Sequence, residues 1–142
     1  MASVRVWPPL AVAALSATVA VRAASACLRK QDVLGRLLRR AEFLSVTARG
    51  RKWVAPGVIV QLLDQPSQDS IRLGLTASRR VGGAVERNRA RRRLRALATE
   101  LLPQSGLANC DVVLIARPET VTRKAPDLRR DVEWCLRRLQ RA

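Results

Sequence analysis

The sequence predicts a single α+β domain with the element order α-β-β-β-α-β-α. Residues 71–78 alternate between apolar and polar side chains, which is the pattern of a half-buried strand. Residues 90–101 instead carry apolar side chains at helical spacing, and residues 112–116 form a continuous apolar run that is typical of an inner strand. With 142 residues, the chain can form one domain with a hydrophobic core.

The first helix is predicted over residues 37–48. Its apolar face, at spacing i, i+3, i+7, consists of Ala41, Leu44 and Ala48. Phe43 and Thr47 form a neighbouring stripe at i, i+4. Gly50 is expected to end this helix.

Three strands are predicted to follow, over residues 52–54, 58–63 and 71–77. The Pro56-Gly57 pair separates the first two, and turn-forming residues at 64–67 separate the second from the third. The second strand is almost entirely apolar and should be buried. We expect the second and third strands to pair antiparallel.

The second helix follows the Gly82-Gly83 pair and is expected to end before Pro103. Its buried stripe should be Ala90, Leu94, Leu97, Ala98 and Leu101. The last helix should begin near Pro126, because proline suits the first helical turn. Its buried side chains are predicted to be Leu128, Val132, Cys135, Leu136 and Leu139. Trp134 lies off this stripe and is predicted to be partly in the core rather than a stacking surface.

The charge of the chain is strongly positive. It has 27 Lys and Arg against 11 Asp and Glu, a formal net charge of +16 and a pI of about 11.8. A hydrophobic content of 48% is too high for a disordered basic protein. Such a folded basic domain is expected to bind an acidic partner, with nucleic acid favoured and a membrane surface as the alternative.

The composition excludes several kinds of catalysis. The chain has no histidine, which rules out Ser-His-Asp and Cys-His catalysis and His-ligated metals. Its acids are scattered rather than clustered, as a metal-dependent nuclease would require. Cys27, Cys110 and Cys135 form no CxxC pair, and the last two are expected to be core thiols in a reducing compartment. We therefore expect no catalytic residue and no metal ligand in this chain.

Residues 78–95 contain eight arginines and one acid. On a helical wheel, the side chains opposite the apolar stripe are Asn88, Arg89, Arg91, Arg92 and Arg95. Arg93 flanks this arc, and Arg87 lies nearer the inward side at the helix entrance. Arg79 and Arg80 precede the two glycines, beside a helix start that favours anions. The pattern predicts a phosphate-binding face, and the alternative is a solvated helix surface.

Residues 78–95 resemble the signature of the bacterial ribonuclease P protein subunit, whose pattern is roughly [KR]-[KR]-x-G-x-A-V-x-R-N-R-x-[KR]-R. Four other segments resemble the same family, namely residues 38–43, 72–78, 111–118 and 128–132. The resemblance covers about residues 34 to 140. It implies an α/β sandwich like the second domain of ribosomal protein S5, with a left-handed βαβ crossover.

The resemblance also implies a function. In this family, the RNA subunit is the ribozyme and uses Mg²⁺ to remove the 5′ leader from precursor tRNA. The chain would then be a cytoplasmic subunit of an endoribonuclease that binds the catalytic RNA and precursor tRNA. It would bind no cofactor alone, and would require neither a membrane nor a protein partner. The alternatives are a ribosomal or nucleoid component, a self-sufficient nuclease and an exported cationic protein.

Two sets of site residues follow from the motif match. Those implied to bind the RNA subunit are Arg79, Arg80, Arg87, Asn88, Arg89, Arg91, Arg92 and Arg95. The leader-binding cleft would contain Phe43, Thr47 and Gln61. Thr47 and Gln61 stand where members of the family often have aromatic residues, so Phe43 is expected to supply most of the stacking, with Trp53 nearby as the other candidate ring. Gly83 stands where Asn is usual, which argues against a side chain at that loop that binds metal or phosphate.

Residues 1–32 have no counterpart in the family. An apolar run at residues 10–21 is followed by Ala24-Ser25-Ala26, as in a secretory signal, but it is too short to span a membrane. We expect this segment to be a disordered extension or to result from a mis-assigned start, with the native start near Val33. Residues 33–142 are then the single RNA-binding domain.

Overall fold

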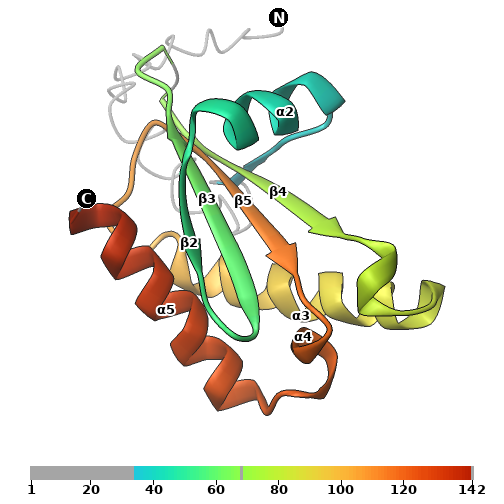
Figure 1. The fold of residues 1–142 in the computed structure, drawn as a ribbon. Helices are drawn as coiled ribbons and strands as arrows, with labels where there is room; N and C mark the ends of the chain where they lie inside the picture. Colours follow the sequence, from blue (N-terminus) through green and yellow to red (C-terminus); the bar gives the residue numbers. More distant parts are fainter. Residues whose placement is uncertain (1–33, 68, 142) are drawn as a thin grey trace, which may run out of the picture.

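The computed structural model describes residues 34–67 and 69–141. The expectations for residues 1–32 and for a start at Val33 therefore lie outside the described residues. The elements in chain order are β1 (Leu34–Arg36), α2 (Arg40–Arg49), β2 (Arg51–Val54), β3 (Val58–Asp64), β4 (Ile71–Ala77), the 3₁₀ turn η1 (Arg79–Val81), α3 (Ala84–Leu101), β5 (Cys110–Ala116), α4 (Glu119–Thr122) and α5 (Ala125–Arg141) (Figure 1). The predicted α+β class is confirmed, while β1, η1 and α4 were not predicted.

The strands form one mixed sheet in the order β1-β4-β5-β3-β2. The central strand, β5, pairs parallel with β4 and antiparallel with β3. The expected antiparallel pairing of the second and third predicted strands, β3 and β4, is therefore wrong. The physical reason is the burial of β5, in which every residue except Ile115 is buried. A strand this apolar is stabilised by neighbours on both edges, so it lies between β3 and β4.

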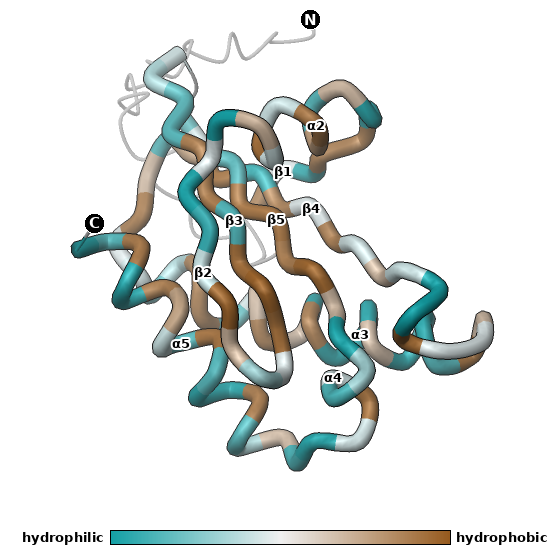
Figure 2. Tube along the Cα trace, viewed as in Figure 1, coloured by the Kyte–Doolittle hydropathy of each residue, from teal (hydrophilic) through white to brown (hydrophobic). Residues whose placement is uncertain are grey.

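Helices cover the two faces of the sheet unequally. On one face, α3 and α5 pack over a main core in which Val112 and Leu114 of β5 meet Leu94 of α3 and Val132 of α5. On the other face, α2 covers only one end of the sheet, with a small cluster that includes Val113 (Figure 1). The colouring in Figure 2 shows the hydrophobic residues concentrated along β3 and β5, between these layers.

The predicted inward faces of the two long helices are confirmed. Ala90, Leu94 and Ala98 of α3 are fully buried. Leu101 is 6% exposed, and Leu97 packs against the same core. All five residues predicted for the last helix are buried, because α5 presents one continuous apolar stripe to the sheet.

The predicted face of the first helix is wrong. Leu44 is 57% exposed, whereas Val46 is fully buried. Phe43, placed on a neighbouring stripe, is half-buried against the small cluster. Residues 34–36 form an edge strand, so the helix begins at Arg40 and meets the sheet along the line through Phe43 and Val46. Gly50 does end the helix, as predicted.

Candidate nucleic-acid interface

The basic face of α3 is positioned by its apolar stripe. Because Ala90, Leu94 and Ala98 are buried against the sheet, the polar side chains between them must point outward. The residues of the predicted interface that are exposed are Arg79, Arg80, Asn88, Arg89, Arg92 and Arg95. Arg87 and Arg91 are half-buried. The structure thus brings all eight predicted RNA-contacting residues onto α3 and the turn before it.

The turn before α3 depends on glycine. Gly82 has φ +134°, a conformation that side-chain-bearing residues rarely adopt, and a Cβ atom there would meet the Glu86 carboxylate. That carboxylate accepts a hydrogen bond from the Gly83 N–H at the helix start. Glu86 is the only acid among residues 78–95, and it is used to cap the helix rather than to neutralise arginines.

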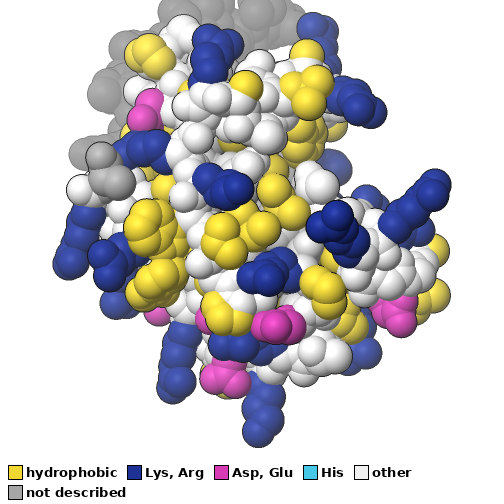
Figure 3. All heavy atoms as spheres, viewed as in Figure 1, with side chains coloured by type: hydrophobic (Ala, Val, Ile, Leu, Met, Phe, Trp, Pro, Cys, Tyr) yellow, Lys and Arg dark blue, Asp and Glu magenta, His cyan; other side chains and the backbone are white. Residues whose placement is uncertain are grey.

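The arginines of the interface lack carboxylate partners in the described part of the chain. Eight of the ten Asp and Glu residues in the described part of the chain form ion pairs, at 2.7 to 3.8 Å, with six arginines elsewhere. Those six are Arg51, Arg72, Arg123, Arg129, Arg130 and Arg137. Figure 3 shows Lys and Arg side chains spread over one face of the molecule, with fewer acidic side chains among them. The acids therefore neutralise arginines away from the interface and leave the α3 face charged.

Arg93 is the exception within α3. Its guanidinium donates to the carbonyl oxygens of Thr120 at 2.6 Å, Val121 at 2.7 Å and Arg123. These carbonyls lie at the end of the short helix α4, where backbone acceptors have no partner within the helix. Arg93 therefore fastens α4 to α3 and is not available to bind an anion.

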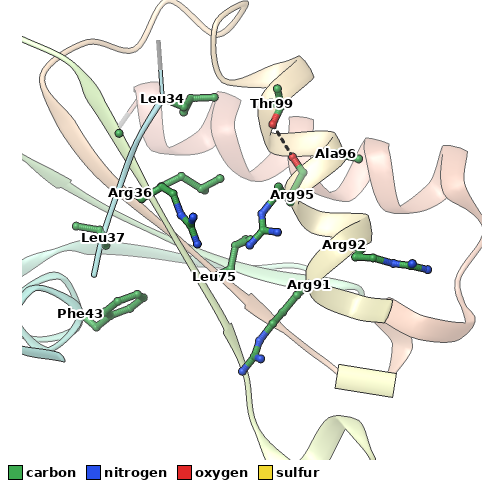
Figure 4. A pocket seen from close by; sticks show the side chains of 12 residues that line it. Leu34, Arg36, Leu37, Phe43, Leu75, Arg91, Arg92, Arg95, Ala96 and Thr99 are labelled. Carbon is green, nitrogen blue, oxygen red and sulfur yellow. Dashed lines mark hydrogen bonds between the residues drawn. The ribbon is translucent and has the colours of Figure 1, made fainter. Parts of the chain in front are cut away.

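A hollow of about 770 Å³ lies beside α3 and is also lined by residues of α2, β1 and β4. Its lining combines an aromatic ring, an apolar floor and guanidinium groups. The residues that carry these features are Phe43, Leu73, Leu75, Arg36, Arg91, Arg92 and Arg95. In Figure 4, Arg91 and Arg95 extend from α3 toward the side of the hollow where Phe43 lies. One surface thus joins the predicted cleft aromatic to the arginine helix, which the sequence did not reveal.

Thr47 and Gln61, also predicted for the cleft, do not line this hollow. The Thr47 hydroxyl group donates to the Phe43 carbonyl oxygen at 2.9 Å and lies 3.2 Å from Gln61 Oε1. Gln61 is only 4% exposed. These two residues connect α2 to β3, and they stand apart from the arginines.

A partly buried ion cluster holds α2 over the sheet. Arg72 of β4 makes two 2.7 Å hydrogen bonds to Asp111 and one of 2.8 Å to Glu42. Glu42 also accepts 3.0 Å hydrogen bonds from the N–H groups of Leu38 and Arg39. The Arg39 N–H is the main cause of a lowered pKa at Glu42, and Arg72 lowers this pKa further. The cluster fixes the helix that carries Phe43, and no local pattern in the sequence indicates it.

Cys110 and Cys135 are buried, as predicted for core thiols. Burial raises the pKa of Cys110 to about 11 and that of Cys135 to about 12. Across residues 34–67 and 69–141, no three His, Cys, Asp or Glu side chains are grouped so that they could hold a metal ion. No helix in this part of the chain is long and apolar enough to cross a membrane.

Fold and surface together define a small α+β protein that presents an arginine-rich helix beside a partly apolar hollow. Residues 33–140 match the family model described as Ribonuclease P. The ribonuclease P protein component of Paramagnetospirillum magneticum is 44% identical over 110 residues, which cover 75% of this chain and 83% of that protein. The corresponding protein of Gluconacetobacter diazotrophicus is 43% identical over 107 residues, with coverages of 75% and 92%. The chain therefore belongs to the ribonuclease P protein family.

Solved structures share the fold. The RNase P protein of Staphylococcus aureus superposes with a TM-score of 0.63 at 24% identity, covering 72% of this chain and 92% of that one. The RNase P protein from Thermotoga maritima gives a TM-score of 0.62 at 23% identity, with coverages of 75% and 96%.

Proposed function

We propose that this chain is the protein subunit of a cytoplasmic ribonuclease P, in which it binds the catalytic RNA through α3. The exposed face of that helix carries guanidinium groups that have no carboxylate partner among the described residues. This observation carries the proposal, because unpaired guanidinium groups fixed on a rigid helix suit bidentate phosphate binding. Membership of the family supports RNA as the polyanion.

We further propose that the 5′ leader of precursor tRNA enters the hollow beside Phe43. A single strand is held well where a ring can stack on a base and cations can contact the backbone. The hollow supplies both, since Phe43 lies on one wall and Arg91 and Arg95 on the other. Thr47 and Gln61 would then position Phe43 rather than touch the leader.

The cleavage itself is assigned to the RNA subunit with Mg²⁺. The chain has no histidine, and eight of its acids are held in ion pairs with arginine. The contribution of the protein would be electrostatic, since bound arginines neutralise phosphates that otherwise require divalent ions.

Reconstitution with the cognate RNA subunit tests this function. We expect RNA-free protein to leave precursor tRNA uncut, and to increase cleavage by the RNA subunit at low Mg²⁺. The variant Arg130→Ala should keep this gain, because Arg130 is an exposed arginine on α5 that pairs with Asp127 and does not line the hollow. Cleavage by RNA-free protein would support a self-sufficient nuclease. RNA binding without any gain in cleavage would support a ribosomal or nucleoid role.

A further inference from the structure

Two of the three tryptophans meet an arginine on the surface formed by β2 and α5. The ring centroids of Trp53 and Trp134 are 5.8 Å apart, with planes inclined at 59°. The Arg138 guanidinium carbon lies 5.8 Å from the centroid of Trp53 and 5.6 Å from that of Trp134. The three groups form a nearly equilateral triangle, in which the cation faces both rings.

Trp134 is more exposed than a core function requires, whereas Trp53 is half-buried and packs against the main core. Trp134 is 44% exposed, although the sequence predicts it to lie partly in the core. The core contacts of α5 are made instead by its neighbours Cys135, Leu136 and Leu139, each at most 3% exposed. An indole left open at the surface of a chain with only 3% aromatic residues indicates a binding surface.

The surroundings of the cluster favour a polyanion as its partner. Arg138 has no carboxylate oxygen within ion-pairing distance among the described residues. Arg141 follows on the same helix end, whereas Arg137 lies 3.6 Å from Glu133, the one acid in the last ten residues of α5. A ring beside unpaired guanidinium groups suits a nucleotide, whose base stacks while its phosphate is neutralised.

We propose that Trp134, Trp53 and Arg138 form a stacking site for an unpaired nucleotide of single-stranded RNA. The site is separate from the hollow beside Phe43. The sheet order β1-β4-β5-β3-β2 places β2 at the edge opposite β1, which lines that hollow. In Figure 3, hydrophobic side chains gather over β2 and α5 with Lys and Arg side chains around them. The proposal therefore adds a second RNA contact beyond the proposed function.

The test uses the full chain with Trp7→Phe, so that emission comes from Trp53 and Trp134 alone. Arg89→Ala and Arg91→Ala are added to weaken the α3 face. The probe is fluorescein-labelled octaadenylate, and its binding is followed by anisotropy and by quenching of tryptophan emission. We expect quenching on binding, and a dissociation constant raised about tenfold by Trp134→Leu, which keeps an apolar side chain but removes the ring.

The control is Leu44→Ala, which removes an exposed apolar side chain from α2 and should leave the affinity unchanged. Equal affinity in Trp134→Leu and its parent, or no quenching at saturation, overturns the proposal. Self-association that Trp134→Leu abolishes, with unchanged octaadenylate binding, would identify a protein interface instead and also overturn it. Because the α3 face is already weakened in this background, failure here is distinct from failure of the proposed function.

Discussion

The arginines of α3 are alike in sequence but differ in what they contact. Arg89 and Arg92 are exposed, whereas the guanidinium of Arg93 is surrounded by three backbone carbonyl oxygens. Arg93 therefore contributes to stability, whereas Arg89 and Arg92 contribute to surface charge. A helical wheel places Arg93 at the edge of the apolar stripe, but it does not reveal that the end of α4 lies there.

We expect Arg89→Ala to weaken binding of the RNA subunit by about 1–3 kcal/mol and to leave the fold unchanged. Arg93→Ala should instead lower the free energy of unfolding by about 1–3 kcal/mol, because three carbonyl groups lose their donor. Urea unfolding and RNA-binding titrations of the two variants measure both effects. The assignment fails if Arg93→Ala unfolds like the wild type.

Phe43 occupies space that only glycine leaves open on β4. A Cβ atom at Gly74 would lie 2.6 Å from Phe43 Cε1 and 2.9 Å from Leu37 Cδ1. We expect Phe43→Ala to reduce the preference for leader-bearing precursor over mature tRNA, by about 1–3 kcal/mol if the ring stacks on a base. Gly74→Ala should reduce the same preference, because it displaces the ring without removing it.

Competition between precursor and mature tRNA for the holoenzyme, together with thermal melts, checks both changes. A large drop in melting temperature with unchanged leader preference would show that Phe43 acts only as a core residue.

At the level of elements, α2 is held to the sheet by charge as much as by apolar contact. Val46 is its one fully buried side chain, and Glu42 links its N-terminus to Arg72 and through it to Asp111. These contacts attach α2 to the sheet. The hollow remains open between α2 and α3.

We expect Glu42→Gln to destabilise the protein in a pH-dependent way. The pKa of Glu42 is lowered from 4.5 in the folded state, so folding favours its charged form. This contribution is complete above the unfolded-state pKa and is lost as the pH falls through the folded-state pKa. The difference in melting temperature between wild type and variant should be largest near about pH 7 and shrink below about pH 4. A difference that stays constant over this range would contradict the role of the carboxylate charge.

Elements with a strong pattern could be predicted from the sequence, and contacts between distant residues could not. The buried stripes of α3 and α5 repeat over several turns, so tertiary contacts do not alter them. The first helix has two short competing stripes, and which of them faces the sheet depends on the edge strand before it. The prediction of strand pairing failed because β5 lies between β3 and β4 in the sheet but is distant from both in the sequence.

The same limit applies to the site. The arginine face is local, and its residues were predicted from helical spacing together with the match to a contiguous motif. The ion cluster joins Arg72 to residues 30 and 39 positions away, Glu42 and Asp111, and no local pattern indicates it. The role of Arg93 likewise depends on a segment more than 25 residues further along the chain.

At the scale of the whole molecule, the small number of acids is distributed so that the positive charge is uneven. On α5, Arg129 is bound by Glu100 and Glu133, and Arg130 lies 3.7 Å from Asp127. On α3, the arginines of the interface have no such partners in the described part of the chain. Among the described residues, α3 and the turn before it therefore carry, besides Arg93, seven arginines that have no carboxylate partner.

This unevenness predicts how salt affects RNA binding. Each phosphate contact that releases a counterion contributes about one unit to the slope of log affinity against log salt concentration. The double variant Arg89→Ala/Arg91→Ala should reduce the slope by about two units. Arg129→Ala/Arg130→Ala removes the same formal charge from α5, where acids already neutralise it, and should leave the slope unchanged. Binding of the RNA subunit measured from about 50 to 400 mM salt distinguishes the two. Equal slopes for both double variants would mean that the protein attracts RNA by net charge alone, and that α3 is not a distinct interface.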